Sequence, residues 1–152
     1  MEKTHIWIDA DSCPALVRNH SIKIANQLGL KITLVANKNI PCSRQYPYEM
    51  KIVPAEKDAA DNFILENLKE NDLVITKDII FADKIVAKGI KAINDRGTVF
   101  CKENIKELLS ERNYDFALAQ AGVVKHYNEG YDKKKFAAFA NCFDKIIHNL
   151  VK

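Results

Sequence analysis

Several aspartates in this sequence stand where short apolar runs end. Asp9 comes directly after residues 6–8, Asp11 lies two positions later, and Asp78 lies two positions after residues 73–76. Carboxylate oxygens suit hard cations such as Mg²⁺ or Mn²⁺, whereas zinc cages usually contain histidine or cysteine. Carboxylates brought close together repel one another, so they favour a bound cation, a proton or full solvation.

The apolar pattern predicts the elements that would position these residues. Short apolar runs alternate with amphipathic stretches, which is typical of a parallel sheet with helices on both faces. We predict one domain over residues 1–152, with about five mainly parallel strands and a C-terminal helix at about 132–150 packed on it. The predicted strands are 5–9, 31–36, 50–53, 73–76 and 90–93, and the predicted helices are 14–28, 58–71, 78–88, 103–112, 114–121 and 132–150.

Parallel strands place their carboxyl ends at one edge of the sheet, where binding sites form. The helix predicted at residue 58 begins at the same edge, so it adds the carboxylates of its first turn. We therefore expect a divalent-metal site for Mg²⁺ or Mn²⁺ at this edge. The residues expected to gather there are Asp9, Asp11, Asn37, Asp58, Asp61, Asp78 and the segment 94–96.

Several of these aspartates also have a purely structural interpretation, whereas Asp9 is harder to explain in that way. Asp58 and Asp61 suit a helix N-terminus, and Asp78 could cap the helix that follows it. Asp95 lies in a sequence that makes a good turn. Asp9 follows a run typical of a central strand, where a carboxylate is costly without a partner. If Asp61 or Asp78 points away from the other carboxylates and caps its own helix, the catalytic interpretation loses most of its support.

Composition excludes several other classes of protein. The chain has 152 residues, a formal net charge of +3, and four cysteines without a C-x-x-C pair. A zinc cage and a disulfide framework are therefore not expected. No apolar run approaches the ~20 residues that span a membrane, and the chain enters its first strand too early for a signal peptide. We expect a cytoplasmic protein that is not inserted in a membrane.

Two further segments invite functional interpretations. Cys13 precedes a helix start, where thiolates are stabilised, but Arg18 is one position too close for a C-x5-R phosphatase loop. Cys13 is therefore expected to be a buried small residue or to stand in for an N-cap residue. The loop over residues 37–48 interleaves Lys38 and Arg44 with two tyrosines, which suits single-stranded nucleic acid. A solvated loop packed on the domain explains the same residues equally well.

Several motifs, taken in order, resemble the YaiI/YqxD family, also called DUF188 or UPF0178. The opening Ile8-Asp9-Ala10-Asp11-Ser12-Cys13-Pro14 is similar to its "DADACP" segment. The later matches are Leu34-Val35-Ala36-Asn37, Ser43-Arg44, Asp58-Ala59-Ala60-Asp61-Asn62, the segment from Asp72 to Asp78, and Arg96-Gly97. The resemblance covers roughly residues 5–122. It departs at Glu56-Lys57-Asp58, where the family usually has a glycine.

The resemblance implies a PIN-like three-layer α/β/α fold, whose members are often Mg²⁺- or Mn²⁺-dependent nucleases. It implies Asp9, Asp61 and Asp78 as metal ligands, with Asp11 as a fourth catalytic or orienting carboxylate. Residues that would hold phosphate or order the site are Asn37, Ser43, Arg44 and Arg96.

Three functions follow as hypotheses. The favoured one is a metal-dependent phosphodiesterase acting on RNA or DNA, with single-stranded nucleic acid as the partner. The first alternative is a phosphatase of the haloacid-dehalogenase type, in which Asp9 and Asp11 form the nucleophile and acid pair. The second is a non-catalytic module that binds a metal or nucleic acid. Two-metal hydrolysis would require at least three carboxylates to converge on a shared volume.

Overall fold

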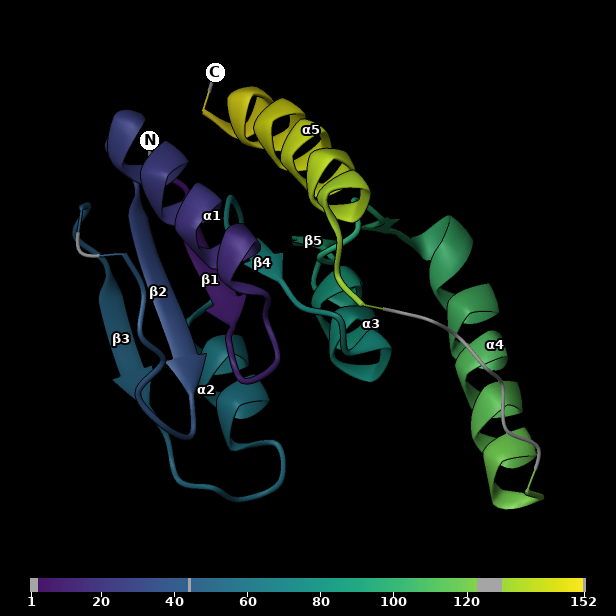
Figure 1. The fold of residues 1–152 in the computed structure, drawn as a ribbon. Coiled ribbons are helices and arrows are strands. Elements are labelled where there is room, and N and C mark those ends of the chain that lie inside the picture. The colour runs from purple at the N-terminus through teal and green to yellow at the C-terminus, as the bar shows by residue number, and fades with distance from the viewer. Residues whose placement is uncertain (1–2, 44, 123–129, 152) are drawn as a thin grey trace.

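The fold is built on a central sheet of six strands, seen in a computed structural model that describes residues 3–43, 45–122 and 130–151 (Figure 1). The strand order is β3-β2-β1-β4-β5-β6. All neighbours are parallel except β5 and β6, which are antiparallel. The strands are β1 (His5–Asp9), β2 (Lys31–Ala36), β3 (Glu49–Ile52), β4 (Leu73–Ile75), β5 (Lys91–Ile93) and β6 (Val99–Phe100).

Helices cover both faces of the sheet. One face packs against α1 (Ala15–Gln27) and α5 (Lys133–Leu150), through buried side chains such as Val17 and Phe143. The other face packs against α2 (Ala59–Asn67) and α3 (Ile79–Ala87), and α4 (Lys102–Gln120) lies against α3. The predicted three-layer α/β/α class is confirmed.

Alternation along β1 decides which side chains face which layer. Ile6 and Ile8 belong to the apolar cluster under α1 and α5, whereas Trp7 belongs to the cluster under α2 and α3. Successive side chains on a strand point to opposite faces, so Asp9 shares the face of Trp7. The last carboxylate of β1 therefore lies on the side where α2 and α3 begin.

Three elements differ from the sequence-based prediction by more than one residue at an end. The helix expected over 58–71 ends at Asn67, because Leu68 is extended and the Asp72 carboxylate accepts the backbone N–H of Lys69. Residues 103–112 and 114–121, expected as two helices, lie in the single helix α4. A two-residue strand, β6, was not predicted, because so short a segment has no readable period.

The connections change direction beside β1. The chain passes from β1 outward to β2 and β3, then crosses back to β4 on the other side of β1. Ligands bind open α/β sheets at such a switch point, beyond the carboxyl ends of the strands. Figure 1 shows β1, β2 and β3 pointing to the same edge, which is where the predicted acidic residues lie.

Across the described residues, the structure has no helix that combines the length and apolar character needed to cross a membrane.

Candidate functional site

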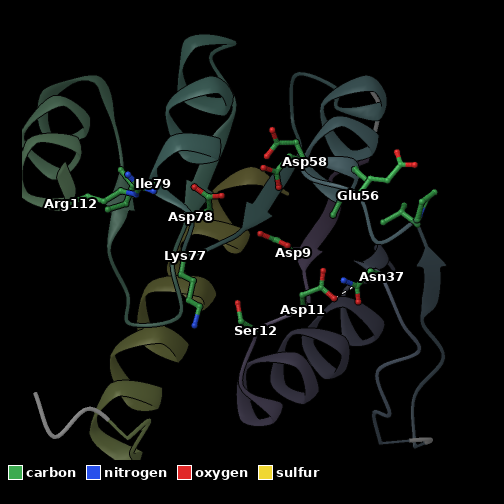
Figure 2. A pocket seen from close by; sticks show the side chains of 15 residues that line it. Asp9, Asp11, Ser12, Asn37, Glu56, Asp58, Lys77, Asp78, Ile79 and Arg112 are labelled. Atoms are coloured by element: carbon green, nitrogen blue, oxygen red, sulfur yellow. Dashed lines mark hydrogen bonds between the residues drawn. The ribbon is translucent and has the colours of Figure 1, made fainter. Parts of the chain in front are cut away.

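A cavity of about 540 Å³ opens at the carboxyl edge of the sheet, where β1, β2 and β4 end and α2 and α3 begin. In Figure 2, Asp9 lies between Asp78 on one side and Asp11 on the other. The wall of this cavity brings together the four aspartates that the sequence analysis selected, which are Asp9, Asp11, Asp61 and Asp78.

Asp9 is held by a hydrogen bond from a buried threonine. The Thr76 hydroxyl donates to Asp9 Oδ2 at 2.9 Å, and the backbone N–H of Asp78 donates to the same hydroxyl oxygen at 3.1 Å. Burial raises the pKa of Asp9, and the charges of Asp78 and Asp11 raise it further. The Thr76 hydrogen bond opposes this rise. Asp9 is therefore fixed in place while its charge is poorly compensated.

Asp61 lies in the first turn of α2 and lines the same cavity. Its pKa is raised to about 7, first by burial and then by the charges of Asp9, Asp78 and Asp58. A carboxyl with this pKa is partly protonated at neutral pH. Burial is thus the main cause of the raised pKa of Asp61, and carboxylates from separate elements add to it.

Asp78 caps helix α3, which is the structural alternative that the sequence analysis gave for it. It is the N-cap residue of α3, and its Oδ1 accepts the backbone N–H groups of Ile80 at 3.0 Å and Phe81 at 3.2 Å. Both cap bonds use Oδ1, and Asp78 still lines the cavity. The capping role weakens the interpretation of Asp78 as a metal ligand, since one oxygen is already committed to the helix.

Asp11 joins the ends of two neighbouring strands. Its Oδ1 accepts the backbone N–H of Asn37 at 3.0 Å, as Figure 2 shows. This bond ties the turn after β1 to the end of β2. Asp11 and Asn37 both line the cavity, on the side away from Asp78.

Asp58 occupies the N-cap position of α2, but its side chain makes no capping hydrogen bond. Its backbone is left-handed, with φ of 63°, a conformation that aspartate tolerates better than most residues. Asp58 and Glu56 line the cavity, so they increase its negative charge. Asp58 therefore occupies the cap position that the sequence predicts, but without the side-chain hydrogen bond of a cap.

Two cations also line the cavity, and the sequence analysis did not select either one. Lys77 lies between β4 and Asp78, and its charge opposes the rise in the pKa of Asp9. Arg112 comes from the middle of α4 and lies on the side of the cavity formed by Ile79 (Figure 2). Lys77 could have been selected from its place at a strand end, whereas nothing in the local sequence distinguishes Arg112. Together they supply positive charge at the rim of an acidic cavity.

The remaining predicted phosphate-binding residues lie elsewhere or outside the described residues. Ser43 lines a separate cavity with His20 and Phe136, on the α1 side of the molecule. Its backbone N–H donates to Asn19 Oδ1 at 3.1 Å. Arg44 lies outside the described residues. Arg96 does not line the acidic cavity, so Asn37 is the member of that predicted set found there.

The Arg96-Gly97 segment forms the turn between β5 and β6. The Asn94 side chain organises this turn by accepting the backbone N–H groups of Arg96 and Thr98, each at 2.9 Å. Gly97 has φ of +84°, and a Cβ there would lie 2.6 Å from the backbone oxygen of Ala138 in α5. Packing of α5 against the turn accounts for this glycine.

Cys13 is partly buried and packs against the apolar cluster under α1 and α5. Burial raises its pKa to about 12, although the nearby Arg18 opposes the rise. The thiol therefore stays protonated at neutral pH, which excludes the thiolate that a cysteine nucleophile needs.

The cavity does not contain a preformed metal cage. Within residues 3–43, 45–122 and 130–151, no three histidine, cysteine, aspartate or glutamate side chains are arranged so that they could hold one ion together. The four aspartates share a cavity without converging on one point. The arrangement therefore lacks the convergence that two-metal hydrolysis requires.

Comparison with known protein families matches residues 7–149 to the family described as "Uncharacterized BCR, YaiI/YqxD family". The chain belongs to the YaiI/YqxD family. This confirms the resemblance carried by the motifs, whereas the grouping with PIN-like domains stays a prediction.

Relatives of this family cover nearly the whole chain. A UPF0178 protein of Maridesulfovibrio salexigens is 43% identical over 93% of this chain and 94% of its own length. A UPF0178 protein of Treponema denticola is 37% identical over 97% of this chain and 94% of its own. One of Pseudoalteromonas atlantica is 38% identical over 93% and 97%, respectively. No solved structure matches the chain.

Proposed function

We propose that the acidic cavity binds Mg²⁺ or Mn²⁺ and hydrolyses phosphodiester bonds in single-stranded nucleic acid in the cytoplasm. The observation that carries this proposal is that Asp9, Asp11, Asp61 and Asp78 line one cavity, where burial and mutual repulsion raise the pKa of Asp9 and Asp61. A divalent cation would relieve that repulsion, since it favours the ionised form of both groups.

The donor set fits a hydrated hard cation better than a caged one. All the candidate ligands are oxygens, and Mg²⁺ keeps several waters while binding one or two carboxylates. Two carboxylates, Asp9 and Asp61, would therefore hold the cation, and Asp78 would add negative charge beside it, since it lines the same cavity. This ligand set needs fewer converging side chains than a two-metal centre.

The remaining residues have roles that follow from their position. A bound cation would supply an activated water and neutralise charge on the phosphate. The Thr76 hydroxyl holds Asp9 in one orientation. Lys77 and Arg112 would attract and orient the phosphate, because they are the cations that line the cavity with these aspartates.

Thermal unfolding with and without Mn²⁺ tests the metal site. Mn²⁺ should raise the Tm of the wild-type protein by a few degrees at pH 7, because ligand binding to the folded state stabilises it. Asp9→Asn should abolish both this rise and the cleavage of single-stranded RNA. Asp83→Asn is the matched control, since Asp83 lies on α3 outside the cavity wall, and it should retain both properties.

The outcomes separate the competing functions. Cleavage that survives Asp9→Asn would contradict the assignment. A Tm rise that depends on Asp9, without turnover on RNA or DNA, would favour the non-catalytic module. A phosphoryl group trapped on Asp9 during turnover of a phosphate monoester would instead favour the phosphatase.

A further inference from the structure

The C-terminal half of α4 projects beyond the carboxyl edge of the sheet. β6 runs antiparallel to β5, so α4 begins at the amino-terminal edge and runs toward the carboxyl edge. α4 has 19 residues and α3 has 9, so α4 is longer by ~15 Å. Ile105 belongs to the apolar cluster under α2 and α3, and Leu108 and Leu109 pack against it. In Figure 1, the far half of α4 extends past α3 and past the arrowheads of β1, β2 and β3.

Arg112 marks the point where α4 passes the acidic cavity. It lines the cavity beside Ile79, the first residue of α3, as Figure 2 shows. One of its N–H groups donates to Asn113 Oδ1 at 3.3 Å, and a guanidinium has further N–H groups that can donate to a phosphate. The part of α4 that follows Arg112 therefore lies beyond the cavity wall, at the mouth of the cavity.

Phe116 lies one helical turn after Arg112, on nearly the same face of α4. Four residues along a helix correspond to ~6 Å of rise and to a rotation of about 40°. Phe116 is 58% exposed, although phenylalanine is among the residue types most often buried. Between residues 110 and 122, Leu118 is partly buried and every other residue is exposed. Phe116 thus presents an exposed aromatic ring next to the mouth of the acidic cavity.

We propose that Phe116 stacks on a base of single-stranded nucleic acid whose phosphate lies beside Arg112. This inference rests on the proposed function and extends it, because it names the part of the substrate that α4 contacts. Proteins that bind single strands combine cations along the backbone with aromatic rings on which bases stack. Two residues one turn apart can contact the phosphate and the base of one nucleotide. The contact selects a single strand, because only unpaired bases are free to lie on a protein ring.

Tyr114 provides a matched control within the same helix. It is 63% exposed, which is close to the exposure of Phe116. It lies about 200° around the helix from Phe116, so it faces away from the side of Arg112. Removing either ring deletes an exposed aromatic side chain of α4. Only the loss of Phe116 should affect a ligand at the cavity mouth.

Fluorescence anisotropy with labelled, phosphorothioate-linked single-stranded DNA tests this contact, because that linkage resists hydrolysis. Titrations are made in Mn²⁺ and again in EDTA. Phe116→Ala should weaken binding about tenfold, within the range for the loss of one base stacked on an aromatic ring. Phe116→Trp should retain the affinity, and Tyr114→Ala should leave it unchanged. An abasic oligomer of the same length should bind Phe116→Ala and the wild type equally, since it has no base to stack.

Two results would overturn this contact. The first is equal affinity of the wild type and Phe116→Ala for the base-bearing oligomer, or an equal loss for the abasic one. The second is a wild-type dimer that Phe116→Ala dissociates in sedimentation velocity while the DNA affinity stays the same. That result would assign the ring to a contact between two copies of the chain.

Steady-state cleavage of single-stranded RNA in Mn²⁺ separates this contact from the proposed function. Base-dependent binding through Phe116 without any cleavage would support the contact and contradict the nuclease. Cleavage with the same KM in Phe116→Ala and the wild type would support the nuclease and overturn the contact. If both hold, Phe116→Ala should raise KM and leave kcat unchanged, because the stacked base contributes equally to the ground state and the transition state.

Discussion

Two carboxylates at opposite edges of the sheet have contrasting surroundings. Asp72, just before β4, is 2% exposed and accepts the backbone N–H groups of His5 and Lys69 and the indole N–H of Trp7, at 2.9–3.1 Å. Asp9, at the end of β1, accepts one hydrogen bond, from Thr76, and faces the charges of Asp11 and Asp78. The fold therefore supplies hydrogen-bond donors to both oxygens of Asp72, whereas the charge of Asp9 is poorly compensated.

This difference distinguishes a structural carboxylate from a candidate functional one. Asp72 connects the start of β1, the indole of Trp7 and the loop after α2, so it helps to define where these elements begin and end. Asp9 lies in a cavity, and its raised pKa shows that the folded protein disfavours its charge. A cation that binds there would favour the ionised form of Asp9, and it would thereby remove this unfavourable electrostatic free energy.

The largest expected effect is the loss of Asp72. Asp72→Ala would leave three N–H donors without their acceptor, so it should lower the free energy of unfolding by about 3 kcal/mol. Urea unfolding measures this change. Asp72→Asn keeps one acceptor oxygen and should cost less. If Asp72→Ala is tolerated as well as a surface substitution, these hydrogen bonds do not define the amino-terminal edge.

An intermediate effect is expected from the titration of Asp61. Its folded-state pKa of about 7 lies above the ordinary aspartate value, so the folded protein binds more protons than the unfolded chain between about pH 4 and pH 7. The free energy of unfolding should therefore fall as pH rises through this window. Because Asp61 is partly exposed, solvent screening limits the contribution to about 1–2 kcal/mol.

Urea unfolding of wild type and Asp61→Asn at several pH values measures this contribution. The wild type should lose more stability than the variant between pH 4 and pH 7, because the amide does not titrate. Parallel pH profiles for the two proteins would show that Asp61 is not under the repulsion that the cavity geometry indicates. Saturating Mn²⁺ should reduce the difference if a cation binds beside Asp61.

The smallest effect on stability is expected at Asp9. Asp9→Asn keeps an oxygen that can accept from Thr76 and removes a partly buried negative charge. The free energy of unfolding at pH 7 should therefore change by less than about 1 kcal/mol, or increase. Urea unfolding beside Asp72→Ala makes the comparison direct. A loss as large as that of Asp72→Ala would mean that Asp9 has a structural role and would remove the contrast between the edges.

Much of the fold follows from local patterns in the sequence. Short apolar runs around residues 6–8, 32–36 and 73–75 indicate buried strands, and Phe136, Phe139 and Phe143 indicate the apolar face of α5. The end of α2 was harder to predict, because it depends on the bond between Asp72 and the N–H of Lys69. The spacing of apolar residues does not show where such a side chain interrupts a helix, because the interrupting residue lies outside it.

The candidate acidic site was predictable in part. Asp9, Asp11 and Asp78 follow strands, so parallel topology alone places them at one edge. Arg112 was not predictable, because it reaches the cavity from α4 only through the packing of that helix against α3. The sequence allows Asp78 to be a helix cap or a metal ligand. Only the structure shows the capping role, because it shows the hydrogen bonds that Asp78 accepts from the backbone N–H groups of Ile80 and Phe81.

The sequence by itself determined the residue types, their order and the strand ends where carboxylates collect. Only the tertiary structure decided which charges are compensated, because that depends on distances between residues far apart in the chain. Asp72 accepts hydrogen bonds from N–H donors at positions 5, 7 and 69. A cavity at the amino-terminal edge of the sheet is lined by lysines at positions 3, 31 and 69. These groups meet because β1 pairs with both β2 and β4, a strand order that local apolar periodicity does not encode.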